Sequence, residues 1–214
     1  IRAKEVLISS GSIERPLVFG NNDTPGVMLS SAAKEYLKVY GVLVGKKPLI
    51  FTNNDSGYET AIDFKKNGVE PIILDTRKDP KSDIIEEAKN LGIQIKFSYV
   101  VTAAKGYKKV KSAEIAKISD NKDELGRLEN ITCDCICVSG FWTPTIHLAS
   151  QSGNKTKFNK EIDAFVPGAS KQNETTLGAA NGTFTLEETL KNSFTAGYEL
   201  SKKITNNDNK VSFP

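Results

Sequence analysis

The stretch from residue 48 to residue 61 most constrains the fold, because a short apolar run there passes into a polar turn and then into helical spacing. That order predicts a strand, a tight turn and a helix, the unit in which dinucleotide-binding domains carry G-x-G-x-x-G. The glycines let the backbone bend and approach a pyrophosphate at the helix N-terminus. In this chain the three positions hold Thr52, Asn54 and Gly57, so the predicted architecture is kept while two of the glycines are replaced.

The surrounding pattern predicts an α/β fold. Apolar runs at 48–51, 69–74 and 93–97 alternate with helical patterns at 56–67 and 83–91, and Ser82 is a suitable N-cap for the second helix. Three further strands, at 99–104, 109–118 and 126–131, read as an antiparallel meander. A helix is also expected from residue 29 to residue 40, with Gly41 as its C-cap. The order βαβαβ followed by a meander is typical of a Rossmann-like domain of the FAD/NAD(P)-binding type.

The two ends of the chain share a second pattern. Residues 5–12 and 175–182 each read as a strand that ends in small residues, and the first has the apolar pattern of a strand buried on both faces. A long helix is expected from residue 185 to residue 204. We therefore expect both strands to lie in one sheet. The α/β pattern between them has the form of a nucleotide-binding domain inserted in another domain.

Composition excludes several classes of function. The 214 residues carry a net charge of +3, and the charges are scattered without a block of one sign, so no nucleic-acid partner is expected. No apolar stretch approaches the roughly 18 residues of a membrane span, and the first residues do not resemble a signal peptide. These features predict a cytoplasmic protein with no membrane partner.

The three cysteines alternate along one predicted strand, at Cys133, Cys135 and Cys137. A metal site is possible, but residues two apart on a strand point to one face in a row and converge poorly on a tetrahedral ion. Burial of small free thiols in a core strand is the favoured interpretation, and no metal ligand is assigned. The odd number also argues against a secreted disulfide framework.

Several segments together resemble a known family. They lie at residues 8–19, 24–28, 52–58, 138–144, 147–153, 164–168 and 178–182. In these segments the chain is similar to the alpha subunit of heterotetrameric sarcosine oxidase. The similarity runs over nearly the whole chain, but it covers only a middle portion of that much longer subunit.

The resemblance implies that residues 1–44 and 139–214 are parts of a first, split nucleotide-binding domain, interrupted by an inserted domain at 45–138. It also implies a subunit of an enzyme that demethylates sarcosine oxidatively to glycine. It implies NAD in the full alpha subunit, with FAD and FMN in the complete complex and not held by this segment alone. Beta, gamma and delta subunits are the implied partners, and the segment by itself is expected to be inactive. Two alternatives remain open: a non-catalytic scaffold module, and the alpha-type subunit of a related opine, proline or cyanide-forming glycine dehydrogenase.

Candidate cofactor-binding residues follow from the same resemblance. Ser10, Gly11 and Ser12 match a small-residue turn that lies against the dinucleotide in two-domain relatives, and Gly178 and Asn181 match the closing motif. A turn facing a cofactor must be small because a side chain would occupy the cofactor's volume. Arg15 has two equal interpretations, a partner for a phosphate or carboxylate and a salt bridge that fixes its loop. No catalytic residue is assigned.

Weaker candidates lie in the predicted inserted domain, at Thr52, Asn54, Gly57 and Asp75. Asp75 ends the second strand about 20 residues beyond the turn, where the fingerprint expects an acceptor for ribose hydroxyls. The alternative is a solvated strand-end carboxylate. Side chains at Thr52 and Asn54 would crowd a pyrophosphate, which favours a turn kept only for the fold. The single histidine, His147, is expected to be a structural or interface residue, because no nucleophile elbow or acidic partner accompanies it.

Overall fold

The structure is a computed structural model that describes residues 3–119 and 124–205. It divides into two compact units, which are described separately. Unit 1 comprises residues 1–13 and 142–214, and unit 2 comprises residues 14–141. Within the described ranges, no helix combines the length and the apolar character needed to cross a membrane.

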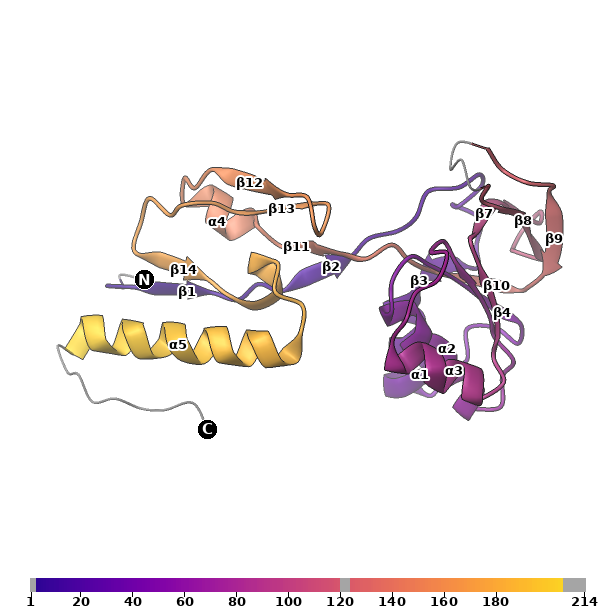
Figure 1. The fold of residues 1–214 in the computed structure, drawn as a ribbon, viewed down its shortest axis with the longest axis horizontal. Helices are drawn as coiled ribbons and strands as arrows, with labels where there is room; N and C mark the ends of the chain where they lie inside the picture. Colours follow the sequence, from indigo (N-terminus) through magenta and orange to yellow (C-terminus); the bar gives the residue numbers. More distant parts are fainter. Residues whose placement is uncertain (1–2, 120–123, 206–214) are drawn as a thin grey trace. The chain divides into compact units, whose positions relative to one another are not determined.

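Unit 2 is built on a five-stranded parallel sheet in the order β3-β10-β4-β5-β6. Helices cover one face of this sheet, and a three-stranded antiparallel sheet covers the other (Figure 1). The parallel strands are β3 (Val27–Leu29), β4 (Pro48–Thr52), β5 (Ile72–Asp75), β6 (Gln94–Phe97) and β10 (Cys135–Ser139). The helices are α1 (Ser30–Tyr40), α2 (Ser56–Lys66) and α3 (Asp83–Asn90), and the antiparallel strands are β7 (Tyr99–Lys105), β8 (Ser112–Lys117) and β9 (Glu129–Thr132). The predicted α/β class and Rossmann-like order are confirmed.

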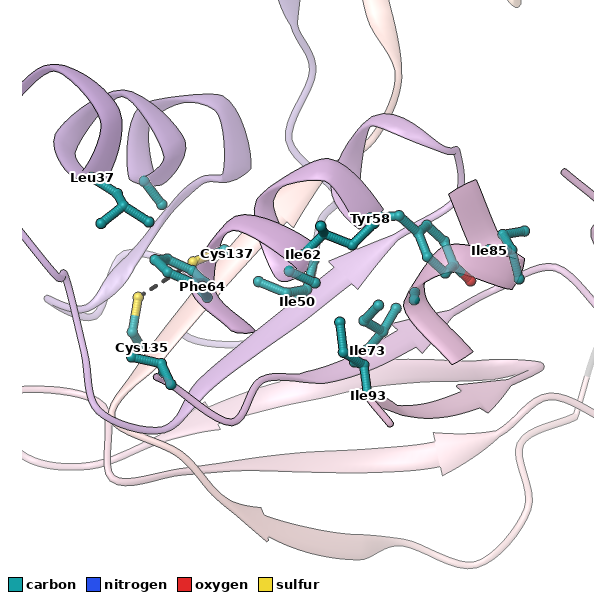
Figure 2. Packing of buried hydrophobic residues seen from close by; sticks show 14 residues of the cluster. Leu37, Ile50, Tyr58, Ile62, Phe64, Ile73, Ile85, Ile93, Cys135 and Cys137 are labelled. Carbon is teal, nitrogen blue, oxygen red and sulfur yellow. Dashed lines mark hydrogen bonds between the residues drawn. The ribbon is translucent and has the colours of Figure 1, made fainter. Parts of the chain in front are cut away.

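The central strands of unit 2 are buried on both faces, as expected for a parallel sheet covered on both sides. Ile50, Tyr58 and Phe64 belong to the cluster on the helical side (Figure 2), while Leu49 and Phe51 pack with β7 and β8 on the other side. The side chains of β4 therefore pack alternately against the helices and against the antiparallel sheet. Each fully buried large side chain contributes about 1.5 to 3 kcal/mol.

All three cysteines are buried and free, as the sequence predicted. Cys135 and Cys137 lie on the helical side with their sulfur atoms 3.5 Å apart (Figure 2). Burial raises the pKa of Cys133 to about 12, and the contact with Cys135 together with burial raises the pKa of Cys137. The thiols of Cys133 and Cys137 therefore stay protonated at neutral pH and act as small apolar side chains. In the parts of the chain that the structure describes, no three His, Cys, Asp or Glu residues come together as a metal site.

Unit 1 contains a parallel strand pair, β1 (Val6–Ile8) with β14 (Glu174–Thr176). The prediction that the two end segments share a sheet is confirmed. An antiparallel pair and three helical segments complete the unit: β12 (Thr156–Asn159), β13 (Ala164–Pro167), α4 (His147–Gln151), the 3-10 helix η1 (Gly178–Asn181) and α5 (Leu186–Thr205). Val6 and Leu7 are each 45% exposed, so the prediction of a first strand buried on both faces is wrong for the structure described.

The chain enters and leaves unit 2 through two paired segments, β2 (Ser12–Glu14) and β11 (Trp142–Pro144). Within unit 2, the Arg15 amide donates to the Phe141 carbonyl at 2.8 Å, and the Gly140 amide donates to the Arg15 carbonyl at 2.7 Å. An added Cβ at Gly140 would lie 2.6 Å from the Arg15 carbonyl oxygen, so this close pairing requires glycine.

The boundary between the units differs from the predicted one. Residues 14–44, which the sequence analysis grouped with the ends of the chain, lie in unit 2. The reason is a long-range pairing, because β3 joins the parallel sheet beside β10 and α1 packs on that sheet and against α2. A pairing between residues so far apart leaves no trace in local periodicity.

Candidate functional site

The turn between β4 and α2 lies at the carboxyl end of the parallel sheet, the edge at which open α/β sheets bind ligands. Thr52, the last residue of β4, is fully buried. Its hydroxyl donates to the Asn54 carbonyl at 2.8 Å and accepts from the Asn54 amide at 3.1 Å. The Thr52 side chain thus fills the inside of the turn, where a first fingerprint glycine would leave space.

Asn54 closes the rest of the turn. Its side-chain oxygen accepts from the Ser56 amide at 2.9 Å, and its side-chain nitrogen donates to the Ser139 carbonyl at 3.1 Å. The Asn53 amide also donates to the Ser139 carbonyl, at 3.3 Å. The amides of Asn53, Asn54 and Ser56 therefore all have protein acceptors. A phosphate at this helix N-terminus would have to displace them.

Gly57 is required by packing. A Cβ atom added there would lie 2.7 Å from the Thr52 Cβ, which is closer than real side chains approach. The third glycine of the fingerprint serves this close helix-to-strand approach, whereas the first permits the tight turn and the second lets the backbone approach the pyrophosphate. Of the three positions, the chain keeps the glycine that packing requires.

Asp75 lies at the end of β5 and is 0% exposed. The Tyr58 hydroxyl donates to it at 2.7 Å, and Arg77 donates from its backbone amide at 2.9 Å and from its guanidinium at 2.8 Å. Arg77 also forms an ion pair with Asp55 at 2.8 Å. Both oxygens of Asp75 accept protein donors, so a ribose would meet an acceptor that is already in use.

The charges around Asp75 also bear on an anionic ligand. Asp55, Asp75 and Arg77 together carry a formal charge of −1 at the end of the sheet where a pyrophosphate would lie. Burial raises the pKa of Tyr58, as does its hydrogen bond to Asp75, so the phenol remains a donor at neutral pH. The sequence predicted either a ribose acceptor or a solvated carboxylate at Asp75, whereas in the structure Asp75 is buried in this cluster. The ion pair to Asp55 was missed because it joins residues from two different strand ends.

In unit 1, the two small-residue turns follow the paired strands β1 and β14 and lie at the same end of that pair. The Leu177 amide donates to the Ile8 carbonyl at 2.8 Å, and the Ser10 hydroxyl donates to the Thr145 carbonyl at 2.7 Å. Gly11 has a φ of +73°, and an added Cβ would meet no atom within 4 Å. The turn after β1 therefore presents an open surface, and Ser12 then begins β2.

The remaining candidate cofactor-binding residues, Gly178, Asn181 and Arg15, are divided between the two units. Gly178, with a φ of +63°, begins η1, and Asn181 ends it with an exposed side chain. Arg15 lies in unit 2, where its Nε donates to the Gly140 carbonyl at 3.2 Å. His147 is exposed at the first residue of α4, and nearby Ser152 donates to the Ala149 carbonyl. The structure thus brings the Ser10–Ser12 and Gly178–Asn181 turns to one end of one strand pair in unit 1, whereas Arg15 belongs to unit 2.

The chain is similar to known proteins both in its sequence and in its fold. No family model matches the chain. The chain is 34% identical over 199 residues to the sarcosine oxidase subunit alpha of Corynebacterium sp. (strain P-1), covering 92% of this chain and 20% of the relative. It is 38% identical over 182 residues to that of Rhizobium meliloti (strain 1021), covering 84% of this chain and 17% of the relative. The chain thus spans about a fifth of the length of these relatives.

Solved structures share the fold at low sequence identity. Thioredoxin reductase from T. acidophilum matches 87% of this chain and 61% of its own, with a TM-score of 0.69 and 18% identity. L-proline dehydrogenase from P. horikoshii matches 83% of this chain and 30% of its own, with a TM-score of 0.54 and 21% identity. The chain is therefore similar over most of its length to one segment of sarcosine oxidase alpha subunits, and it has the Rossmann-like fold of FAD/NAD(P)-binding flavoprotein reductases.

Proposed function

We propose that this chain is a segment of an oxidoreductase subunit of the sarcosine oxidase alpha type. In this proposal unit 1 is part of a split dinucleotide-binding domain, and unit 2 is an inserted scaffold that holds no nucleotide. The observation that carries the proposal is the contrast between the two strand ends. Small residues leave the turn after β1 open, whereas side chains of the protein fill the turn after β4.

The strand pair in unit 1 supports a domain completed by other parts of a longer subunit. Parallel sheets are normally covered on both faces, yet Val6 and Leu7 on β1 are each 45% exposed. The relatives are about five times longer than this chain, which leaves ample sequence to cover these residues. The turns at Ser10–Ser12 and Gly178–Asn181 would lie against the dinucleotide, which we propose to be NAD.

For the complete enzyme we propose the oxidative demethylation of sarcosine to glycine, in a complex with beta, gamma and delta subunits that also contains FAD and FMN. The residues of this chain would contribute cofactor binding and subunit structure, and no catalytic group is assigned to them. Steady-state assays of the intact complex on sarcosine, proline and glycine test the substrate. A higher kcat/KM on proline or glycine than on sarcosine would replace this proposal with the related dehydrogenase activity.

NAD binding is tested by calorimetry on the intact subunit and on residues 1–214 alone. We expect binding by the intact subunit and none by the segment, because part of the proposed site lies outside it. Micromolar binding of NAD by the segment would contradict the split-site proposal.

Two matched glycine variants test whether the turn at Gly11 faces the proposed NAD site. Gly11 and Gly92 both have a φ of +73° and open space around an added Cβ, so Gly11→Val and Gly92→Val impose similar backbone strain. Gly92 lies in unit 2 and belongs to neither of the turns of unit 1. In the intact subunit we expect Gly11→Val to weaken NAD binding at least about tenfold, which is about 1.4 kcal/mol, and Gly92→Val to leave it unchanged. Equal effects of the two variants would show that Gly11 does not face the cofactor.

The scaffold role of unit 2 has a separate test. The double variant Thr52→Gly and Asn54→Gly restores the fingerprint glycines and should leave the NAD affinity of the intact subunit unchanged. A loss of affinity in a variant that retains its circular dichroism spectrum would show that unit 2 takes part in nucleotide binding.

A further inference from the structure

A loop of concentrated positive charge connects β7 and β8. Residues 105–111 contain Lys105, Lys108, Lys109 and Lys111 and no acidic residue, and we call this segment the basic loop. All four lysines are exposed, and Tyr107 beside them is 91% exposed. The modest net charge of the chain, +3, conceals this local cluster, so the description of the charges as scattered without a block of one sign does not hold for residues 105–111. An almost fully exposed aromatic ring gains little from folding, so the fold itself does not account for Tyr107.

Internal contacts hold the basic loop in one conformation. Val110 is fully buried in the core, and its amide donates to the Pro25 carbonyl at 2.9 Å. The Lys111 amide donates to the Lys105 carbonyl at 2.9 Å. At Gly106 an added Cβ would lie 1.9 Å from the Lys109 carbonyl oxygen, so the tight turn requires glycine. A loop that is ordered in advance loses little entropy when it binds.

A second pair of lysines extends the charged surface. The Cys133 amide donates to the Lys111 carbonyl at 3.3 Å, and the Asp134 amide donates to the Lys47 carbonyl at 3.2 Å. The segments that carry Lys46 and Lys47 and the end of the basic loop therefore lie on either side of residues 133–134.

The nearby carboxylates offset only part of this charge. Asp134 accepts from the backbone amides of Lys46 and Lys47, both at 2.8 Å. Glu114 is paired with Lys105 at 3.1 Å, which leaves Lys108, Lys109 and Lys111 without an ion pair among the described residues. The pKa of Glu114 is lowered by its hydrogen bonds to Lys105 and Thr102, so it is charged at neutral pH. The surface remains positive overall.

We propose that the basic loop, with Lys46 and Lys47, docks onto an acidic surface of a protein partner, and that Tyr107 is its anchor. Tyrosine is enriched in protein interfaces, and a central aromatic side chain surrounded by charges is a common arrangement for a binding hot spot. Single-stranded nucleic acids usually stack on several successive aromatic rings, whereas this loop has one. The apolar residue that could enter a membrane, Val110, points into the core. The proposal uses contacts within unit 2 alone and is independent of cofactor binding in unit 1.

The test uses the intact protein and a fluorescein-labelled peptide rich in glutamate, with binding followed by fluorescence anisotropy at several salt concentrations. The charge-reversal variant Lys108→Glu with Lys109→Glu should weaken binding at least about tenfold, and rising salt should weaken wild-type binding. Tyr107→Ala should weaken binding about fivefold with an unchanged salt dependence, because it removes contact area and no charge. The matched control, Lys155→Glu with Lys157→Glu in unit 1, makes the same change in net charge and should bind as the wild type does.

Three results would overturn the proposal. If the control variant weakens binding as much as the loop variant, the peptide responds to overall charge and not to the loop. If Tyr107→Ala binds as the wild type does, the loop has no anchor of the kind proposed. If single-stranded oligo-dT or vesicles containing phosphatidylserine bind more tightly than the peptide at physiological salt, and lose that binding in the loop variant, the surface serves a nucleic acid or a membrane instead.

Discussion

Asp75 is a carboxylate that the fold removes completely from water. Burying an ion costs several kcal/mol unless donors replace the lost solvent. Tyr58 and Arg77 supply those donors, from the start of α2 and from the turn after β5. At the scale of single residues, Asp75 at the end of β5 is therefore tied to the start of α2.

Removal of the Tyr58 hydroxyl should leave Asp75 short of one donor. Tyr58→Phe is expected to lower the free energy of unfolding by about 2 kcal/mol, the range of hydrogen bonds to charged groups. Urea denaturation near neutral pH measures this change. Tyr107→Phe, which removes a hydroxyl from an exposed ring, is the control and should change stability by less than about 0.5 kcal/mol. Equal effects would mean that the bond to Asp75 contributes nothing to stability.

Tyr58 also makes the free energy of unfolding depend on pH. Its pKa in the folded state is raised, first by burial and then by the hydrogen bond to Asp75. The contribution of the protonated Tyr58 phenol to the free energy of unfolding is therefore complete below about pH 10, the pKa of tyrosine in the unfolded chain. It is lost as the pH rises toward the higher pKa of Tyr58 in the folded state. The free energy of unfolding of the wild type should fall more steeply above about pH 10 than that of Tyr58→Phe. Parallel curves for the two proteins would contradict the raised pKa.

At the scale of elements, the approach of α2 to β4 depends on Gly57. Gly57→Ala places a methyl group 2.7 Å from the Thr52 Cβ and should destabilise unit 2 by about 1 to 3 kcal/mol. Adding Thr52→Gly removes the clashing atom and should recover part of that loss, so thermal unfolding of both single variants and the double variant measures the coupling. Purely additive effects would show that the contact is relieved in another way.

A second glycine serves as the control for this experiment. Gly197 lies within α5, and an added Cβ there meets no atom within 4 Å. Gly197→Ala should therefore be neutral or stabilising by up to about 1 kcal/mol, because alanine is the better helix former.

The helices and most of the strands of unit 2 follow from local pattern. Helix α1 ends at Gly41 in the left-handed conformation, as predicted, and Ser82 occupies the N-cap position of α3, although its hydroxyl makes no capping bond. Local pattern could not show that β3 joins the sheet beside β10, because that pairing connects distant parts of the chain. For the same reason, the charge cluster of Asp55, Asp75 and Arg77 became visible only when the ends of β4 and β5 were placed side by side.

At the scale of the whole molecule, unit 2 has its own core and its two ends are joined by the hydrogen bonds between Arg15, Gly140 and Phe141. Residues 14–141 expressed alone should therefore fold and unfold cooperatively. Denaturation followed by far-ultraviolet circular dichroism checks this, and its midpoint should match the transition assigned to unit 2 in residues 1–214. A gradual transition without a midpoint would mean that unit 2 depends on unit 1.

The paired ends of unit 2 also set an order of events during folding. In unit 1 the Asn173 side chain donates to the Lys4 carbonyl, 169 positions away, beside the pairing of β1 with β14. Closing so long a loop in an unfolded chain is slow, because its entropy must be lost before any contact is gained. Once unit 2 has folded, the Arg15 amide lies 2.8 Å from the Phe141 carbonyl, and the flexible connection between the two strands becomes short. During synthesis β1 emerges before unit 2, and we expect it to pair with β14 only after unit 2 has folded.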